Sequence, residues 1–159
     1  MAIFIPGMHC AVSGKAIASS DEVVAFPAFV SNQADPLYVF SDAVVHVEAF
    51  QKHPLADKVQ ARYSEFRERN APKSRLCFIC GKQIADPDDY LGLGYLIDDQ
   101  SHPLFRFNYA HFHRCCLRGW NELPALLDQI KDFDRSGQWK GDGLKWLVKV
   151  LRNERTGRP

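Results

Sequence analysis

The sequence predicts an α+β chain that contains one small unit twice, each copy with a cysteine turn, a β-hairpin and a helix, followed by an amphipathic C-terminal helix. Three observations lead to this prediction. The segment CFICGK at 77–82 is preceded by CAVSGK at 10–15. Residues 10–50 align with residues 77–117 without a gap and with 12 identities in 41 positions. Apolar residues recur at helical spacing in three other segments.

The two cysteine turns keep a glycine and a lysine at matching places, Gly14 with Lys15 and Gly81 with Lys82. Glycine adopts a positive φ without steric cost, so it can close a tight turn behind a cysteine. We therefore expect both segments to form the same turn.

A hairpin strand follows each turn. The segment DPLYVFSDAVVH at 35–46 aligns with HPLFRFNYAHFH at 102–113, and both end in a histidine, His46 and His113. The intervening YLGLGYL at 90–96 contains two glycines. Since neither a lysine nor a helical pattern follows it, we interpret it as a strand and turn rather than a phosphate-binding loop.

Helical spacing marks the rest of each unit. Pro54 is placed to open a helix whose apolar face carries Leu55, Val59, Tyr63 and Phe66, and residues 124–133 have a similar pattern. We expect a first unit at 1–70, a second unit at 77–136 and a C-terminal helix at 141–155. The link at 70–75, which contains proline, is the predicted boundary.

Composition excludes several classes of protein. A chain of 159 residues with 46% hydrophobic residues can form a core, but no apolar run approaches the roughly 18 residues of a membrane helix. The start MAIFIPGMHC lacks the features of a signal peptide, and five cysteines are an odd number. We therefore expect a cytoplasmic protein with reduced thiols and no membrane association.

Four residues of the second unit predict a metal site: Cys77, Cys80, His113 and Cys116. Two close pairs of sulfur and imidazole donors suit tetrahedral zinc, and a closed Cys3His set is typical of structural sites. We expect one structural Zn2+ per chain.

The alternatives to a zinc site are a redox Cys-x2-Cys pair and thiols buried in a core. His111 and Cys115 align with Val44 and Glu48, so we expect neither as a ligand, and Cys115 to be an apolar filler or a free thiol.

The first unit has only half of this set. The positions that match the four ligands hold Cys10, Ser13, His46 and Ala49. Two ligands do not make a structural zinc site. We expect a vestigial, metal-free site in a unit held by apolar packing around Val12, Val45 and Phe50, with a weak site completed by His9 or Glu48 as the less favoured alternative.

The segments CFICGK and AHFHRCCLRGW together resemble treble-clef zinc fingers, the group that includes the RING and LIM domains. This resemblance implies a zinc knuckle, a hairpin and a helix whose first turn supplies the last two ligands. A RING finger needs a second ligand set, which is missing, so ubiquitin-ligase activity is not expected. Nor do His102, His111 and Asn121 have the spacing of a treble-clef nuclease.

A closed zinc site without a catalytic constellation favours a non-catalytic protein-binding module of adaptor, regulator or toxin-neutralising type. The alternative is nucleic-acid binding, because the C-terminal segment is basic and the segment at 62–75 is basic too. The candidate phosphate contacts are Lys140, Lys145, Lys149, Arg152 and Arg155. An enzyme is less favoured, and the sequence leaves the partner and the oligomeric state open.

Overall fold

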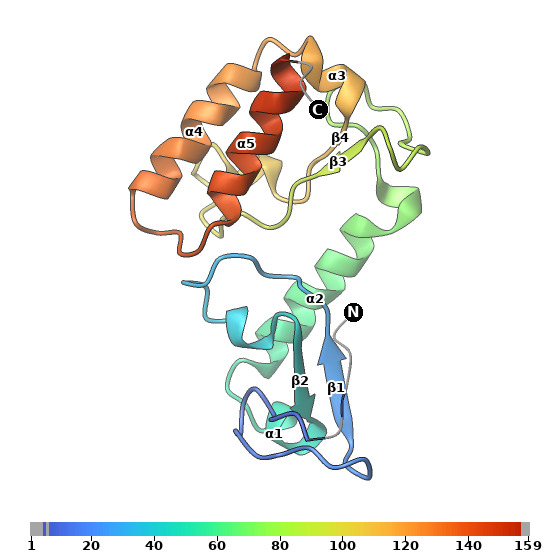
Figure 1. Cartoon of the computed structure of the whole chain (residues 1–159), viewed down its shortest axis with the longest axis vertical. Helices are drawn as coiled ribbons and strands as arrows, with labels where there is room; N and C mark the ends of the chain where they lie inside the picture. Colours follow the sequence, from blue (N-terminus) through green and yellow to red (C-terminus); the bar gives the residue numbers. More distant parts are fainter. Residues whose placement is uncertain (1–4, 6, 157–159) are drawn as a thin grey trace.

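Two small antiparallel hairpins and five α-helices make up the part of the chain that the structure describes (Figure 1). The structure is a computed structural model that describes residue 5 and residues 7–156, so residues 1–4 and 6 of the predicted first unit lie outside it. The first half contains β1 (Val23–Phe26), β2 (Ala43–His46), α1 (Val47–Gln51) and α2 (Ala56–Asn70). The second half contains β3 (Tyr90–Gly92), β4 (His111–His113), α3 (Arg114–Arg118), α4 (Leu123–Arg135) and α5 (Gly143–Thr156). Single 3-10 turns at Tyr38–Phe40, Pro72–Ser74 and Phe105–Phe107 complete the elements.

The two hairpins have the same register. Val23 pairs with His46 in the first hairpin, and Tyr90 pairs with His113 in the second. Each residue of the second pair lies 67 positions after its counterpart in the first pair. The other two pairs of the second hairpin match the first at the same displacement. The sequence alignment and the strand pairing therefore agree residue by residue.

Local backbone geometry recurs at the same displacement. Gly14 and Gly81 both have the positive φ expected of the two turns, 67° and 70°. Asp42 and Tyr109, at the start of the returning strand, adopt φ values of 53° and 56°, which are uncommon for residues other than glycine. Side chains confirm the match, because Ser41 Oγ accepts the N–H groups of residues 29 and 30 while Asn108 Oδ1 accepts those of residues 96 and 97.

The helices begin at matching positions as well, α2 at Ala56 and α4 at Leu123. The first begins two residues after Pro54, because the N–H of Ala56 first closes a turn onto the carbonyl of His53 at 2.9 Å. The C-terminal helix α5 extends over Gly143–Thr156, close to the predicted 141–155.

Each half has its own cluster of buried side chains. In the first, Phe26, Phe40 and Val59 lie at the centre, and Tyr63 and Phe66 of α2 pack on it. The second cluster is larger, and α5 contributes to it the three leucines of its buried face, Leu144, Leu147 and Leu151. An ion pair between Arg114 of α3 and Glu154 of α5 ties the C-terminal helix to the second hairpin's helix.

Contacts between the halves form along α2 and at one loop. The Arg62 guanidinium lies 3.4 Å from the centre of the Tyr95 ring and 2.6 Å from Asp98 Oδ1. The backbone N–H of Lys140 donates to Asn32 Oδ1 at 2.9 Å, and the Asn32 amide donates to the carbonyl of Gln138 at 3.0 Å. Polar groups on both sides therefore fix the relative position of the halves.

We expect Arg62→Ala to weaken the coupling of the two halves by about 1–3 kcal/mol. Its side chain is 12% exposed and approaches both Asp98 and the mostly buried Asp35, so its loss leaves a carboxylate without its cation. Thermal unfolding should become broader or split in two. Arg67→Ala on the same helix, where the side chain is exposed, is the control, and an unchanged transition for Arg62→Ala would contradict the prediction.

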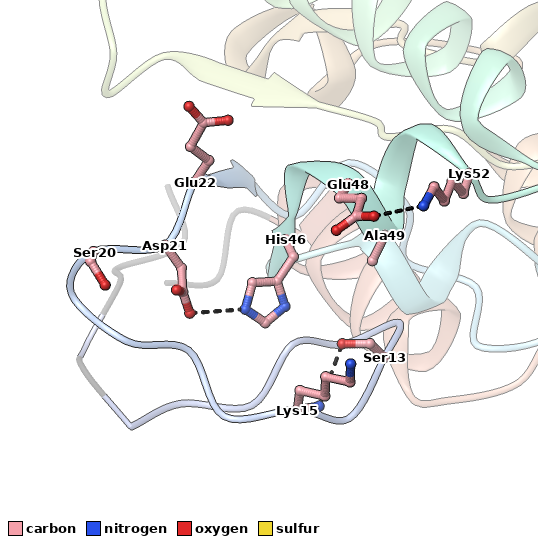
Figure 2. A pocket seen from close by; sticks show the side chains of 9 residues that line it. All are labelled: Ser13, Lys15, Ser20, Asp21, Glu22, His46, Glu48, Ala49 and Lys52. Carbon is pink, nitrogen blue, oxygen red and sulfur yellow. Dashed lines mark hydrogen bonds and ion pairs between the residues drawn. The ribbon is translucent and has the colours of Figure 1, made fainter.

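A hollow of about 590 Å³ opens beside the start of α1 (Figure 2). Ser13, His46 and Ala49 line it, and these are three of the four positions predicted to be a vestigial site. Among the described residues, no helix is long and apolar enough to cross a membrane.

Candidate metal centre

The turn at 77–82 brings two thiols to one side of the chain. The N–H of Cys77 donates to the carbonyl of Lys82, and the N–H of Gly81 donates back to the carbonyl of Cys77, both at 2.8 Å. This double closure requires the positive φ of Gly81. The second cysteine, Cys80, is thereby held on the exposed side of the turn while Cys77 is buried.

The other two donors come from the junction of β4 and α3. His113 is the last residue of β4 and the N-cap of α3, and Cys116 lies in the first turn of that helix. The N–H of Arg114 donates to the carbonyl of Asp89, and the Arg114 guanidinium bonds the carbonyl of Tyr90 and pairs with Glu154. The helix that carries Cys116 is thus fixed to both β3 and α5.

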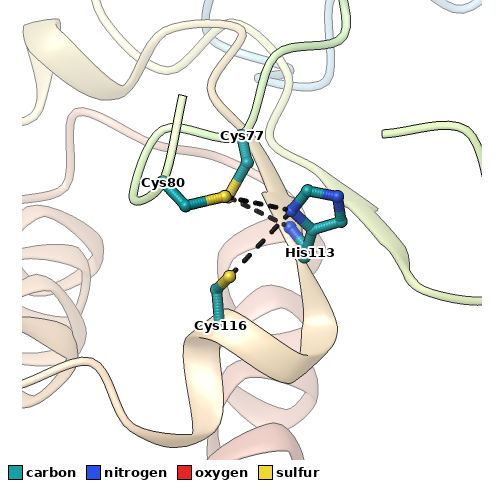
Figure 3. A group of neighbouring side chains, drawn as sticks. All are labelled: Cys77, Cys80, His113 and Cys116. Atoms are coloured by element: carbon teal, nitrogen blue, oxygen red, sulfur yellow. Dashed lines mark hydrogen bonds between the residues drawn. The ribbon is translucent and has the colours of Figure 1, made fainter. Parts of the chain in front are cut away.

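These four side chains converge on one point (Figure 3). One donor atom from each lies within 4.8 Å of the others. Nδ1 of His113 faces two sulfurs, at 3.5 Å from Cys80 Sγ and 3.9 Å from Cys116 Sγ. The arrangement identifies Nδ1 as the ligating nitrogen of His113.

The protonation of the thiols fits a cation at this point. Burial raises the pKa of Cys77, but hydrogen bonds from the N–H groups of His113, Cys80 and Ile79 outweigh it and lower the pKa to about 6. Burial and the neighbouring sulfurs of Cys80 and Cys77 raise the pKa of Cys116 to about 12. Three thiolates cannot share so small a space without a positive charge, whereas a bound divalent cation stabilises them.

The donor set fits Zn2+ in kind and in number. Three sulfurs and one imidazole nitrogen match the four positions of a tetrahedral zinc site, so protein would fill every coordination position of a bound ion. A bound ion would cross-link the turn at 77–82 to the start of α3. Since Cys116 releases its proton when it ligates, metal affinity is expected to rise with pH.

The neighbouring Cys115 and His111 are not members of this group of donors. Cys115 is an exposed free thiol whose Sγ donates to Asp89 Oδ2 at 3.2 Å, so it is not an apolar filler. His111 is buried between the hydroxyl of Tyr90, 3.0 Å from Nδ1, and the carbonyl of Arg69, 2.8 Å from Nε2. Its role is to join α2 to the second hairpin.

His102, whose spacing was compared with that of a treble-clef nuclease, makes structural contacts with its neighbours. Nδ1 of His102 accepts the N–H of Leu104 at 3.1 Å, and its ring packs on Phe133. Asn121 is exposed beyond the end of α3. These contacts explain both histidines as structural residues.

In the first half the four matching positions also lie together, but with different chemistry. Cys10 is buried, and its Sγ accepts the N–H of His46 at 3.4 Å, as Cys77 accepts that of His113. Ser13 and Ala49 bring no sulfur. Of the less favoured additional ligands, Glu48 pairs with Lys52 at 2.6 Å, and His9 is an exposed residue in a bridge to Ala16. Val45 and Phe50 are buried, and Val12 packs against the cluster to which they belong, as predicted.

One contact of the first half was not predicted. Nε2 of His46 lies 3.2 Å from Asp21 Oδ2. The sequence contained a weak signal for it, because Asp21 is one of the identities of the alignment, but the matching Asp88 has no such contact among the hydrogen bonds of the described residues.

Four of the predicted phosphate contacts lie exposed on α5, and the fifth, Lys140, is exposed just before that helix. Lys145, Lys149 and Arg152 are spaced four and three residues apart and are exposed, as are Lys140 and Arg155. Asp142 pairs with Lys145 at 3.0 Å. Beside these basic side chains, Trp146 is 62% exposed.

Comparisons with protein-family models, curated proteins and solved structures found no match to this chain.

Proposed function

We propose that the chain is a non-catalytic protein-binding module built from two treble-clef-like units, of which the second is stabilised by a structural zinc ion. The observation that carries the proposal is the closed Cys3His group, which leaves a bound ion no position for water or substrate. The recurrence of strand register, turn geometry and helix starts at a displacement of 67 residues supports the duplication.

The candidate binding surface lies beside the candidate metal centre. Leu76 and Phe78 flank Cys77, and their side chains are 51% and 41% exposed. Large apolar side chains on a turn that a metal stiffens are typical of a surface that recognises another protein, because little conformational entropy is lost on binding.

Two measurements test this proposal. Metal analysis should find one zinc per chain, and X-ray absorption should find three sulfurs and one nitrogen around it. An oxygen ligand from water would overturn the non-catalytic assignment.

For the binding surface, we expect Leu76→Asp to abolish capture of a partner that the wild-type protein retains. Val39→Asp is the matched control, since Val39 is 43% exposed but lies in the first half. Equal capture of the partner by both variants would show that the surface around Leu76 is not the binding surface.

A second candidate function is the binding of single-stranded nucleic acid by α5. The observation that favours it is Trp146, which is exposed next to Lys149 and can stack on a base while the basic side chains of α5 contact phosphates. We expect Trp146→Ala and Lys149→Glu each to weaken binding of a fluorescent oligonucleotide at about 50 mM salt by about tenfold or more. Lys58→Glu, an equal charge change on α2, is the control, and no binding by the wild-type protein at that salt would exclude this function.

A further inference from the structure

The first half retains the backbone of the metal-binding turn. The N–H of Cys10 donates to the carbonyl of Lys15 and the N–H of Gly14 donates to the carbonyl of Cys10, both at 2.8 Å, the distances found at Cys77 and Gly81. The His46 N–H lies 3.4 Å from Cys10 Sγ, as the His113 N–H does from Cys77 Sγ. Cys10 and His46 therefore occupy the places of a sulfur and an imidazole ligand.

Asp21 holds the ring of His46 from one side. Its Oδ2 lies 3.2 Å from Nε2 and also accepts the N–H of Ala18 at 2.8 Å, so the carboxylate is itself positioned by the chain. In Figure 2, Asp21 lies on one side of the ring, while Ser13 and Ala49 lie on the other. Asp21 contacts Nε2 of His46, whereas His113 presents its other ring nitrogen, Nδ1, to its cysteines.

The pKa values of Cys10 and His46 are both shifted from their ordinary values. Burial raises the pKa of Cys10, but the Ser13 hydroxyl and the N–H groups of Ser13, His46 and Val12 outweigh it and lower the pKa to about 6. The Cys10 side chain and then Asp21 raise the pKa of His46. Both shifts favour the charged forms, a protonated His46 ring beside the Asp21 carboxylate and an ionised Cys10 sulfur at the turn.

We infer that a cross-link through Asp21, His46 and Cys10 closes the first turn in place of a metal, so that the first half folds without zinc while the second half requires it. This inference uses the proposed duplication for comparison, but its contacts stand without it. Asp21 is a positioning residue here, since it holds the His46 ring, and the backbone N–H of His46 in turn donates to the Cys10 sulfur.

Other charged side chains line the hollow around the His46 ring, and they could also affect the pKa of His46. The side chains that line it with His46 and Asp21 are Ser13, Lys15, Ser20, Glu22, Glu48, Ala49 and Lys52. The pairing of Glu48 with Lys52 cancels one charge of each sign, and Lys15 and Glu22 add one further charge of each sign to the lining. Asp21 is thus the carboxylate that bonds the ring directly.

The test is an NMR titration of His46 in the zinc-loaded protein with Asp21 intact and with Asp21→Asn. We expect the pKa of His46 to fall toward its ordinary value in the variant, whereas Glu22→Gln, the neighbouring residue on the same hollow, leaves it nearly unchanged. An equal pKa of His46 in all three proteins overturns the inference.

The sign of the stability effect follows from the raised pKa. The imidazolium contribution is fully present below the ordinary pKa of histidine, about 6.5, and is lost as the pH rises through the pKa of folded His46. The deficit in melting temperature of Asp21→Asn should therefore be larger near pH 6 than near pH 9. A deficit that grows with pH would contradict the cross-link.

Two further measurements keep the inference testable if Asp21→Asn does not fold. In the wild-type protein a His46 pKa at or below the ordinary value overturns it. Hydrogen exchange after chelation gives the second readout, where we expect residues 10–17 and 43–50 to stay protected while residues 77–84 and 110–117 exchange. Loss of protection in both halves overturns the claim of a metal-independent first half without affecting the proposed zinc site.

Discussion

Cys80→Ser is expected to abolish zinc binding and unfold the second half of the chain. The substitution gives the second turn the residue that stands at position 13 of the first. Structural zinc contributes apparent binding free energies of about 10–16 kcal/mol, as much as the roughly 5–15 kcal/mol that stabilises a whole domain. Once three donors remain, the turn at 77–82 and the start of α3 lose their cross-link. Near-ultraviolet circular dichroism and hydrogen exchange should both report the loss.

Cys115→Ser is the matched control for this experiment. It removes a thiol next to Cys116 in sequence, but one that is exposed and bonded to Asp89 rather than directed at the cluster. We expect one zinc per chain and a melting temperature within a few degrees of wild type. A folded Cys80→Ser protein with full zinc occupancy would show that the site is not the four-ligand centre described above.

The double substitution Ser13→Cys with Ala49→Cys is expected to create a second zinc site in the first half. The backbone of the first turn, the strand register and the place of His46 before α1 all match the second half, so two added sulfurs complete a Cys3His group. Under reducing conditions, mass spectrometry of the native protein should find two zinc ions per chain. The first half should gain several kcal/mol of stability in zinc.

The control for this gain is Ser13→Cys alone, which supplies three donors and should bind zinc weakly. Adding Asp21→Asn to the double variant should lower the affinity of the new site by about 10–100-fold, since a carboxylate on the far nitrogen of a ligating histidine orients the ring and raises its basicity. A single zinc ion in the double variant would show that the two turns differ more than their hydrogen bonds indicate.

Much of the fold was predictable because most of its elements recur at a displacement of 67 residues. The strand that ends in His46 or His113, the turn closed by Gly14 or Gly81 and the helices beginning near 56 and 123 are all visible as matched columns. When the same hydrophobic pattern occurs twice at a fixed spacing in the sequence, the assignment of its helices and strands is more certain than from either copy alone. The prediction of the helix start at Pro54 failed by two residues, because a turn through His53 precedes α2.

The candidate ligands were predictable for a chemical reason. The spacing Cys-x2-Cys and His-x2-Cys places donors in two close pairs whatever lies between them, and a fold that joins the pairs completes the site. Contacts between segments without such a motif were not predictable. The pairing of Arg62 with Tyr95 and Asp98 and the bond from His111 to Arg69 depend on how α2 lies against the second hairpin.

The sequence by itself determined the donor set Cys77, Cys80, His113 and Cys116, the missing donors at Ser13 and Ala49, and the order of the elements, because these follow from residue type and local spacing. Tertiary structure decided what replaces the missing donors. The carboxylate of Asp21 reaches His46 across 25 residues only because the loop before β1 folds back beside the end of β2. A hydrogen bond between distant residues depends on the path of the whole chain, and local spacing does not specify that path.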